Sequence, residues 1–132
     1  MVTKRDTRTL VLPIEQDEIY MTLLDVECLN LMTGWAMEMD KKPDGVFRSL
    51  CGSIEGRVVS LEPTERLILE FCPAVLRVHW KVKLTIFLEE IDDGTRIFFH
   101  SEGLPSSHAE PWRDLLQERF IQPLALFFSD ED

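Results

Sequence analysis

The sequence predicts an α+β domain, in which a curved antiparallel sheet of about six to seven strands wraps around a long C-terminal helix. Apolar and polar residues alternate with a period of two through the middle of the chain, as in strands with one buried face. Glycines occur inside these runs, where they usually mark bulges or curvature. The last part of the chain has a helical apolar period instead. Strands followed by a helix are typical of this fold class.

The C-terminal run predicts a helix of about five turns. Ser107 and Glu110 form a capping-box pattern, so we expect the helix to begin there, with Pro111 in its first turn. Pro123 should kink this helix or end its first part. The apolar stripe at helical spacing comprises Trp112, Leu115, Leu116, Phe120, Leu124 and Phe127.

The N-terminal part predicts one strand and two short helices. The strand covers residues 7–12 and is closed by Pro13. Residues 14–24 form the first expected helix, with acidic residues in its first turns, where they interact favourably with the helix dipole. Asp25 is suited to cap the second, residues 26–32.

Turn sequences divide the rest of the chain into strands. Pro-Asp-Gly at residues 43–45, residues 62–65 and Asp-Asp-Gly at residues 92–94 are typical of turns. The longest strand predicted covers residues 77–89, with alternating apolar and polar faces. The other expected strands are residues 35–40, 46–50, 52–61, 66–71 and 95–101.

The composition limits the classes of function that the protein can have. The 132 residues fit a single domain spanning positions 1–132, and the polar N-terminus does not resemble a signal peptide. No run approaches the length of a membrane helix. The net charge of −10 argues against a nucleic-acid surface. Three cysteines without CxxC spacing predict free thiols in a reducing, cytoplasmic compartment, and no metal site is expected.

An ordered set of residues resembles the family named for the activator of the ninety-kilodalton heat-shock chaperone's ATPase. The resemblance covers roughly residues 7–128 and corresponds to the C-terminal domain of the eukaryotic activator. It implies the START/Bet v-like helix-grip fold and a co-chaperone role in the stress response. The residues that carry it are Val46, Phe47, Gly52, Ile54, Gly56, Val58, Leu61, Pro63, Leu67, Gly94, Thr95, Arg96, His100, Gly103, Leu104, Pro105 and Trp112.

The chain also departs from the family pattern. Phe71 stands where the family often has tryptophan. The activator's N-terminal domain, which in the family drives most of the stimulation, has no counterpart in this sequence. We therefore expect chaperone binding with little ATPase stimulation. The alternative function is a carrier or sensor of a small apolar ligand, held in a cavity under the C-terminal helix.

The candidate cavity residues have two interpretations. Methionines line adaptable binding surfaces, but they also fill irregular gaps in ordinary cores. Met32 belongs to the same cluster of methionines as the candidates Met37 and Met39. Each candidate is therefore either a wall of the cavity or a core residue. The candidates are Trp35, Met37, Met39, Trp80, Phe99, Trp112, Leu116 and Phe120.

Arg77, Lys81 and Lys83 form a basic strip on the polar face of the longest strand. It is either a docking face for an acidic partner or a device against aggregation of the sheet. No catalytic motif is visible, and His100 with Glu102 is expected to be a surface pair on one strand face. The sequence therefore predicts a protein that is not an enzyme and needs no cofactor.

Overall fold

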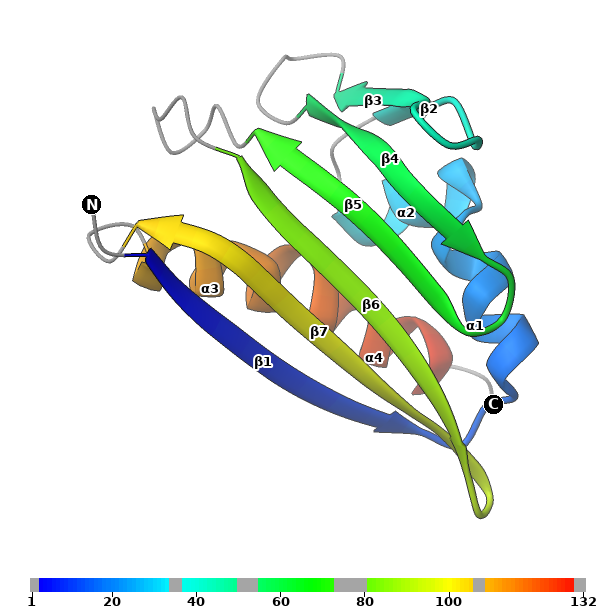
Figure 1. Cartoon of the computed structure of the whole chain (residues 1–132). Helices are drawn as coiled ribbons and strands as arrows, with labels where there is room; N and C mark the ends of the chain where they lie inside the picture. Colours follow the sequence, from blue (N-terminus) through cyan, green and yellow to red (C-terminus); the bar gives the residue numbers. More distant parts are fainter. Residues whose placement is uncertain (1–2, 34–36, 50–54, 73–80, 106–108, 130–132) are drawn as a thin grey trace.

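The computed structural model describes residues 3–33, 37–49, 55–72, 81–105 and 109–129, in which seven strands form one sheet with the helices on one of its faces (Figure 1). The predictions for Trp35, Arg77, Trp80 and Ser107 lie outside these residues. The elements are β1 (Thr3–Leu12), α1 (Gln16–Leu23), α2 (Val26–Thr33), β2 (Met37–Met39), β3 (Val46–Ser49), β4 (Glu55–Glu62), β5 (Arg66–Cys72), β6 (Val82–Ile91), β7 (Gly94–Pro105), α3 (Ala109–Leu116), the π-helical turn η3 (Gln117–Ile121) and α4 (Gln122–Ser129).

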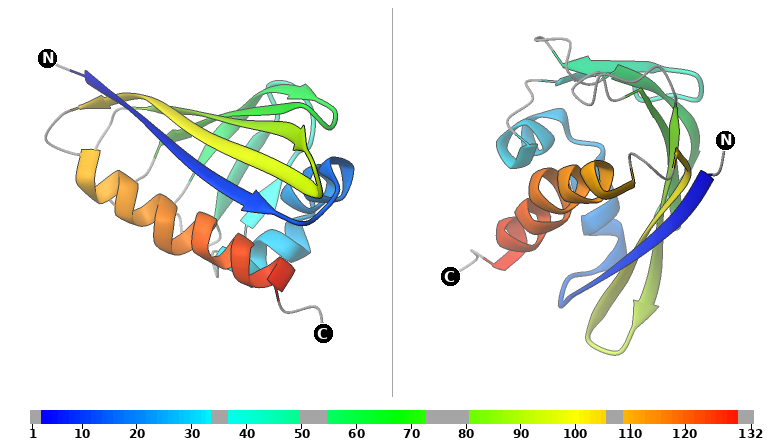
Figure 2. Two further views of the ribbon diagram at one scale, coloured as in Figure 1. Left: turned by 90° about the horizontal axis from the view of Figure 1, so that it is seen from below. Right: turned by 90° about the vertical axis from the view of Figure 1, so that its left-hand side faces the viewer.

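The sheet is antiparallel, in the order β1-β7-β6-β5-β4-β3-β2. Strands β2 to β7 follow one another, whereas β1 crosses to the far edge and pairs with β7. Figure 2 shows the sheet curving around the helix formed by α3, η3 and α4, with α1 and α2 beside it. The predicted α+β fold, a curved sheet on a long C-terminal helix, is confirmed.

Alternation along the strands places the core on the inner face of the sheet. Val82, Leu84, Ile86 and Leu88 of β6 are buried, while the residues between them point to the outer face. The C-terminal helix covers this face with the predicted stripe, in which Trp112 is only 2% exposed. Its other buried members are Leu116, Phe120 and Leu124, and Leu115 and Phe127 pack against the core from its margin.

The proline in the C-terminal helix interrupts its α-helical hydrogen bonds. Pro123 has no N–H, and its ring would collide with the carbonyl four residues earlier. The chain responds with the wider turn η3, in which the Gln122 N–H bonds to the Gln117 carbonyl. The α-helical part predicted to end near Pro123 therefore ends at Leu116 and resumes at Gln122, and the helix runs on as one rod (Figure 2).

Several element boundaries differ from the sequence prediction, among them the ends of β6 (Val82–Ile91, predicted over residues 77–89) and β7 (Gly94–Pro105, predicted over residues 95–101). The first helix begins at Gln16 rather than Ile14, because Glu15 has an extended backbone and the Ile14 carbonyl accepts a bond from Thr95. The strand predicted over residues 7–12 begins at Thr3, because β7 extends to Pro105 and pairs with it beyond a bulge between Lys4 and Asp6.

Candidate functional site

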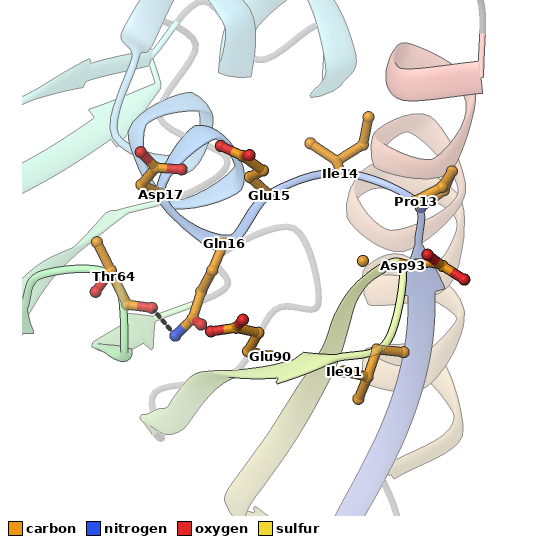
Figure 3. Close-up of a pocket in the computed structure, with 10 residues that line it drawn as sticks. Pro13, Ile14, Glu15, Gln16, Asp17, Thr64, Glu90, Ile91 and Asp93 are labelled. Carbon is orange, nitrogen blue, oxygen red and sulfur yellow. Dashed lines mark hydrogen bonds between the residues drawn. The ribbon is translucent and has the colours of Figure 1, made fainter.

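A pocket of about 500 Å³ lies at one end of the sheet (Figure 3). Three segments meet there: the connection from β1 into α1, the turn between β4 and β5, and the hairpin between β6 and β7. Its volume is within the range of small-ligand sites. The lining residues are Pro13, Ile14, Glu15, Gln16, Asp17, Thr64, Glu90, Ile91, Asp93 and Gly94.

Hydrogen bonds hold the pocket walls together. The hydroxyl of Thr95, which is fully buried, donates to the Ile14 carbonyl at 2.7 Å and ties the connection to the hairpin. The Gln16 amide donates to the Thr64 carbonyl (Figure 3) and, at 3.2 Å, to the Leu88 carbonyl. At Gly94 a Cβ would lie 2.2 Å from the Leu12 carbonyl oxygen, so the close approach of these segments requires glycine. The pocket is therefore preformed.

The lining is strongly acidic. Carboxylates come from the start of α1, Glu15 and Asp17, and from the hairpin, Glu90 and Asp93, whereas no lining residue is basic. In Figure 3 the Glu90 side chain lies below Gln16, and Glu15 and Asp17 lie on the opposite side. Asp17 Oδ1 accepts the Glu18 N–H at 2.9 Å. None of the four carboxylates forms an ion pair with any residue that the structure describes.

Two groups outside the pocket lining, on α1 and at the end of β4, have shifted pKa values. Burial raises the pKa of the Tyr20 hydroxyl, and the negative charge of Glu62 adds to the rise. This hydroxyl has no hydrogen-bond partner among the described residues. The hydrogen bond from Arg66 lowers the pKa of Glu62. The charged turn between β4 and β5 is thus partly neutralised by its own arginine.

A second pocket, of about 290 Å³, contrasts with the first. It lies across β3, β4 and β5 and includes Arg57, Glu70 and Lys81. Arg57 bonds to Asp44 at 2.8 Å and to Glu70 at 3.1 Å, while Lys81 Nζ lies 3.6 Å from the same Glu70 carboxylate. The charges of Arg57, Glu70 and Lys81 are therefore compensated within the chain, whereas Glu55, which also lines this pocket, forms no ion pair with a described residue.

The two described lysines of the predicted basic strip lie on the outer face of the sheet, and Arg77 lies outside the described residues. Lys81 and Lys83 are both exposed. Glu70 on β5 and Glu102 on β7 are the cross-strand neighbours of Lys83. The strip is therefore interleaved with carboxylates, which sequence periodicity along one strand does not reveal.

Most of the predicted cavity residues that the structure describes belong to the core. Phe99, Trp112, Leu116 and Phe120 are buried between the sheet and the C-terminal helix, and Met39 packs against this core while half-buried. None of these five lines either pocket. The side chain of Met37, like Trp35 and Trp80, lies outside the described part.

His100 forms a hydrogen-bonded chain on the outer face. Its Nδ1 lies 2.7 Å from Thr7 Oγ1, and its Nε2 lies 3.1 Å from Glu102 Oε1. When the imidazole is neutral, this arrangement fits the tautomer in which Nε2–H donates to Glu102 and Nδ1 accepts from the threonine hydroxyl. His100 and Glu102 are part-exposed and line neither pocket. The described residues contain no group of three or more metal-ligating side chains, and no described helix is long and apolar enough to cross a membrane.

Sequence reasoning missed the acidic pocket. In the sequence, Glu15 and Asp17 are typical of a helix N-terminus, and Asp93 is typical of a hairpin turn. Their charges were visible in the sequence, but only the pairing of β1 with β7 brings the two segments together.

Comparisons with known proteins identify the fold. No family model matches the sequence. An uncharacterized protein of Schizosaccharomyces pombe, C1711.08, is 20% identical over 112 residues, which are 85% of this chain and 33% of that protein. The chain thus spans about a third of the length of this curated relative.

Among the similar solved structures, two examples match this chain over nearly their whole length. An HSP90 activator from Plasmodium falciparum has a TM-score of 0.79 at 14% identity, covering 96% of both chains. The protein Ara h 8.0201 has a TM-score of 0.80 at 12% identity, covering 98% of this chain and 100% of the other. The chain therefore has the START/Bet v-like helix-grip fold.

Proposed function

We propose that this chain is a co-chaperone-like interaction module that binds the ninety-kilodalton heat-shock chaperone in the cytoplasm. The sequence resemblance to the activator family and the likeness to the Plasmodium HSP90 activator support this proposal. The observation that carries it is the aromatic packing between sheet and helix. Ring centroids are 5.5 Å apart for Phe71 and Trp112 and 6.1 Å apart for Phe99 and Phe120, so aromatic side chains pack against one another between the sheet and the helix. We therefore expect the contacts with the chaperone to lie on the outer surface of the chain.

The outer sheet face offers a docking surface. Lys81 and Lys83 are exposed there and fit an acidic partner, although Glu70 and Glu102 lie beside them. One small domain offers a modest interface, and transient complexes bury less than about 1,200 Å². We therefore expect micromolar-class binding to the nucleotide-bound chaperone and little ATPase stimulation by this module alone.

Titration calorimetry with the purified chaperone at low and at physiological salt tests the proposal. Lys81→Glu with Lys83→Glu should weaken binding and flatten its salt dependence, because charged rim residues mainly affect association. The matched control is Lys41→Glu with Lys42→Glu, an equal charge change in the exposed turn between β2 and β3. Absence of heat at both salt concentrations would overturn the proposal. If the substitutions at Lys81 and Lys83 leave binding unchanged, the docking surface lies elsewhere on the chain.

The second candidate function is a carrier of a small apolar ligand. The helix-grip fold implied by the resemblance to the activator family is shared with lipid-transfer START domains, which favours this candidate, and Met39 is half-buried at the margin of the core. Organic extraction of the purified protein, followed by mass spectrometry, separates this candidate from the first. A stoichiometric lipid would favour the carrier.

We also propose that the module has no catalytic turnover. The hydrogen-bonded side chains of Thr7, His100 and Glu102 resemble the nucleophile, base and orienting acid of a catalytic triad. It lies on a sheet face where neither described pocket encloses a substrate. His100→Ala and Glu102→Ala should leave chaperone binding unchanged, and a drop of about a hundredfold in any hydrolytic assay would contradict this proposal.

A further inference from the structure

We infer that the free edge of β1 pairs with an extended acidic segment of a partner protein, which adds a strand to the sheet. The site consists of the backbone edge of β1 that faces away from β7 and of the charged side chains of β1 beside it. The inference does not depend on the chaperone being the partner. It rests on an open strand edge and on charge complementarity.

The first argument is that the edge of β1 is open. β1 is the last strand on one side of the sheet, and no described element lies beyond it in the plane of the sheet (Figure 1). A strand in this position presents a row of N–H and C=O groups that no neighbouring strand uses. The outward backbone groups of β1 have no hydrogen-bond partner among the described residues. The strand at the opposite edge, β2, has only three residues.

The second argument is that the edge is regular before any partner arrives. The residues from Asp6 to Leu12 pair with β7 without a register shift, and the bulge lies before them, between Lys4 and Asp6. On the inner face, Asp6 Oδ1 lies 3.6 Å from Arg113 Nε, an ion pair that ties β1 to α3. The chain therefore offers a preformed edge, and the conformational entropy lost on binding is mainly that of the partner.

The third argument is that β1 is the most basic element in the described part of the chain. It contains Lys4, Arg5 and Arg8 against the single carboxylate of Asp6, a net charge of +2 in a chain of net charge −10. No other described helix or strand has a net charge above +1. Arg5 is exposed, and Arg8 is half-buried beside Asp6. A positive edge on an acidic protein attracts an acidic segment to this position.

The same charges disfavour a second copy of this chain as the occupant. Pairing β1 with another β1 would bring two basic strands together, and cations on an edge strand are a common device against such pairing. The repulsion becomes attraction when the incoming strand carries carboxylates. The cations of β1 therefore select against self-association and in favour of an acidic strand.

The outer face beside the edge favours β-branched side chains in the partner. Thr7, Thr9 and Val11 are exposed there, and Val11 is 54% exposed. Alternate residues of an added strand would lie on this face, next to these three. Threonine and valine form favourable cross-strand pairs with β-branched side chains. The expected segment is therefore acidic, extended and rich in β-branched residues.

Backbone hydrogen exchange of the whole chain, followed by NMR, tests the inference. The probe is a capped peptide of alternating glutamate and valine that matches residues 6–12 in length. With free peptide at about ten times its Kd, exchange should slow about tenfold. The slowing should occur at every second amide of residues 6–12, because alternate N–H groups of a strand face its free edge.

Two control peptides separate strand pairing from attraction by charge. The first has lysine in place of glutamate and should not bind. The second keeps the glutamates but carries N-methyl groups on its central residues, which removes the N–H donors that pairing requires. It should leave the exchange of β1 unchanged.

Matched variants separate the edge from the overall charge. Arg5→Gln with Arg8→Gln should weaken binding of the glutamate peptide about fourfold to 25-fold, because each exposed ion pair contributes about twofold to fivefold. Lys41→Gln with Lys42→Gln removes the same charge from the exposed turn between β2 and β3, at the other edge of the sheet. It should change binding less than about twofold. Thermal melts should show that both variants remain folded.

Several outcomes would overturn the inference. One is the absence of binding by the glutamate peptide, and another is equal protection by the lysine peptide. Equal binding of the N-methylated peptide would show attraction by charge without strand pairing. Equal weakening by both variant pairs would indicate unspecific attraction. Protection of the same amides in the free protein as its concentration rises would assign the edge to a second copy.

Discussion

The inner face of the sheet and the acidic pocket at its end are organised by different rules. Between sheet and helix, Trp112 contacts Phe71 and donates its Nε1–H to the Ser101 hydroxyl at 2.9 Å, so a buried polar pair is satisfied inside an apolar core. In the pocket, Glu90 and Asp93 have no partner among the described residues. A core that satisfies its polar groups stabilises the fold, whereas exposed carboxylates without an ion-pair partner contribute little to its stability.

The largest expected effect is at the centre of the inner face. Trp112→Ala should lower the free energy of unfolding by about 3–5 kcal/mol, because it leaves a cavity and removes the donor to Ser101. Trp112→Phe keeps most of the ring and should lose less. Urea melts measure both, and a loss below about 1 kcal/mol for the alanine variant would contradict the packing described here.

The next effect is at the junction between core and pocket. Thr95→Val preserves shape but leaves the Ile14 carbonyl without its bond, so we expect a loss of about 1–3 kcal/mol. Thr9→Val, on the exposed side of β1, is the matched control and should change stability little. Equal losses in thermal melts of both variants would show that the Thr95 hydroxyl does not hold the connection before α1.

A smaller effect is expected at the start of α2. Asp25 Oδ1 accepts the N–H groups of Glu27 at 2.9 Å and Cys28 at 3.3 Å, as the sequence predicted for a cap. Asp25→Ala should lower stability by about 1 kcal/mol, and Asp25→Asn should restore most of it. Chemical denaturation compares the two, and an alanine variant as stable as wild type would rule out the cap.

The same carboxylate affects Cys28. Burial raises the pKa of the Cys28 thiol, and Asp25 raises it further. Less thiolate is then present at neutral pH, so alkylation of Cys28 should be slower than that of a free cysteine and should accelerate in Asp25→Asn. Peptide mass spectrometry after iodoacetamide treatment over a pH series follows this site alone. An unchanged rate in the variant would contradict the proposed influence.

The smallest effect is expected in the pocket. Glu90→Gln with Asp17→Asn should change stability by no more than about 0.5 kcal/mol, since neither carboxylate has an ion-pair partner among the described residues. A loss above about 1 kcal/mol in urea melts would mean that these charges support the fold, and would end the contrast with the inner face.

The sequence predicted the inner face well because its rules are local. The period of two in β6 and the helical spacing from Trp112 to Leu124 each depend on neighbouring residues. Helix ends were predicted less well: the first helix starts at Gln16 because Ile14 bonds to Thr95, far away in the chain. The pocket required the crossover that pairs β1 with β7, which periodicity does not encode.

The central claim is that the inner face stabilises the fold while the outside binds a protein partner. Native mass spectrometry of the purified protein, alone and mixed with the nucleotide-bound chaperone, tests whether the interior holds a ligand instead of packed side chains and whether the outside binds the chaperone. We predict the bare mass of the chain when alone, and a complex with the chaperone that dissociates as salt rises. A stoichiometric lipid adduct on the chain alone, with no chaperone complex in the mixture, would contradict the account.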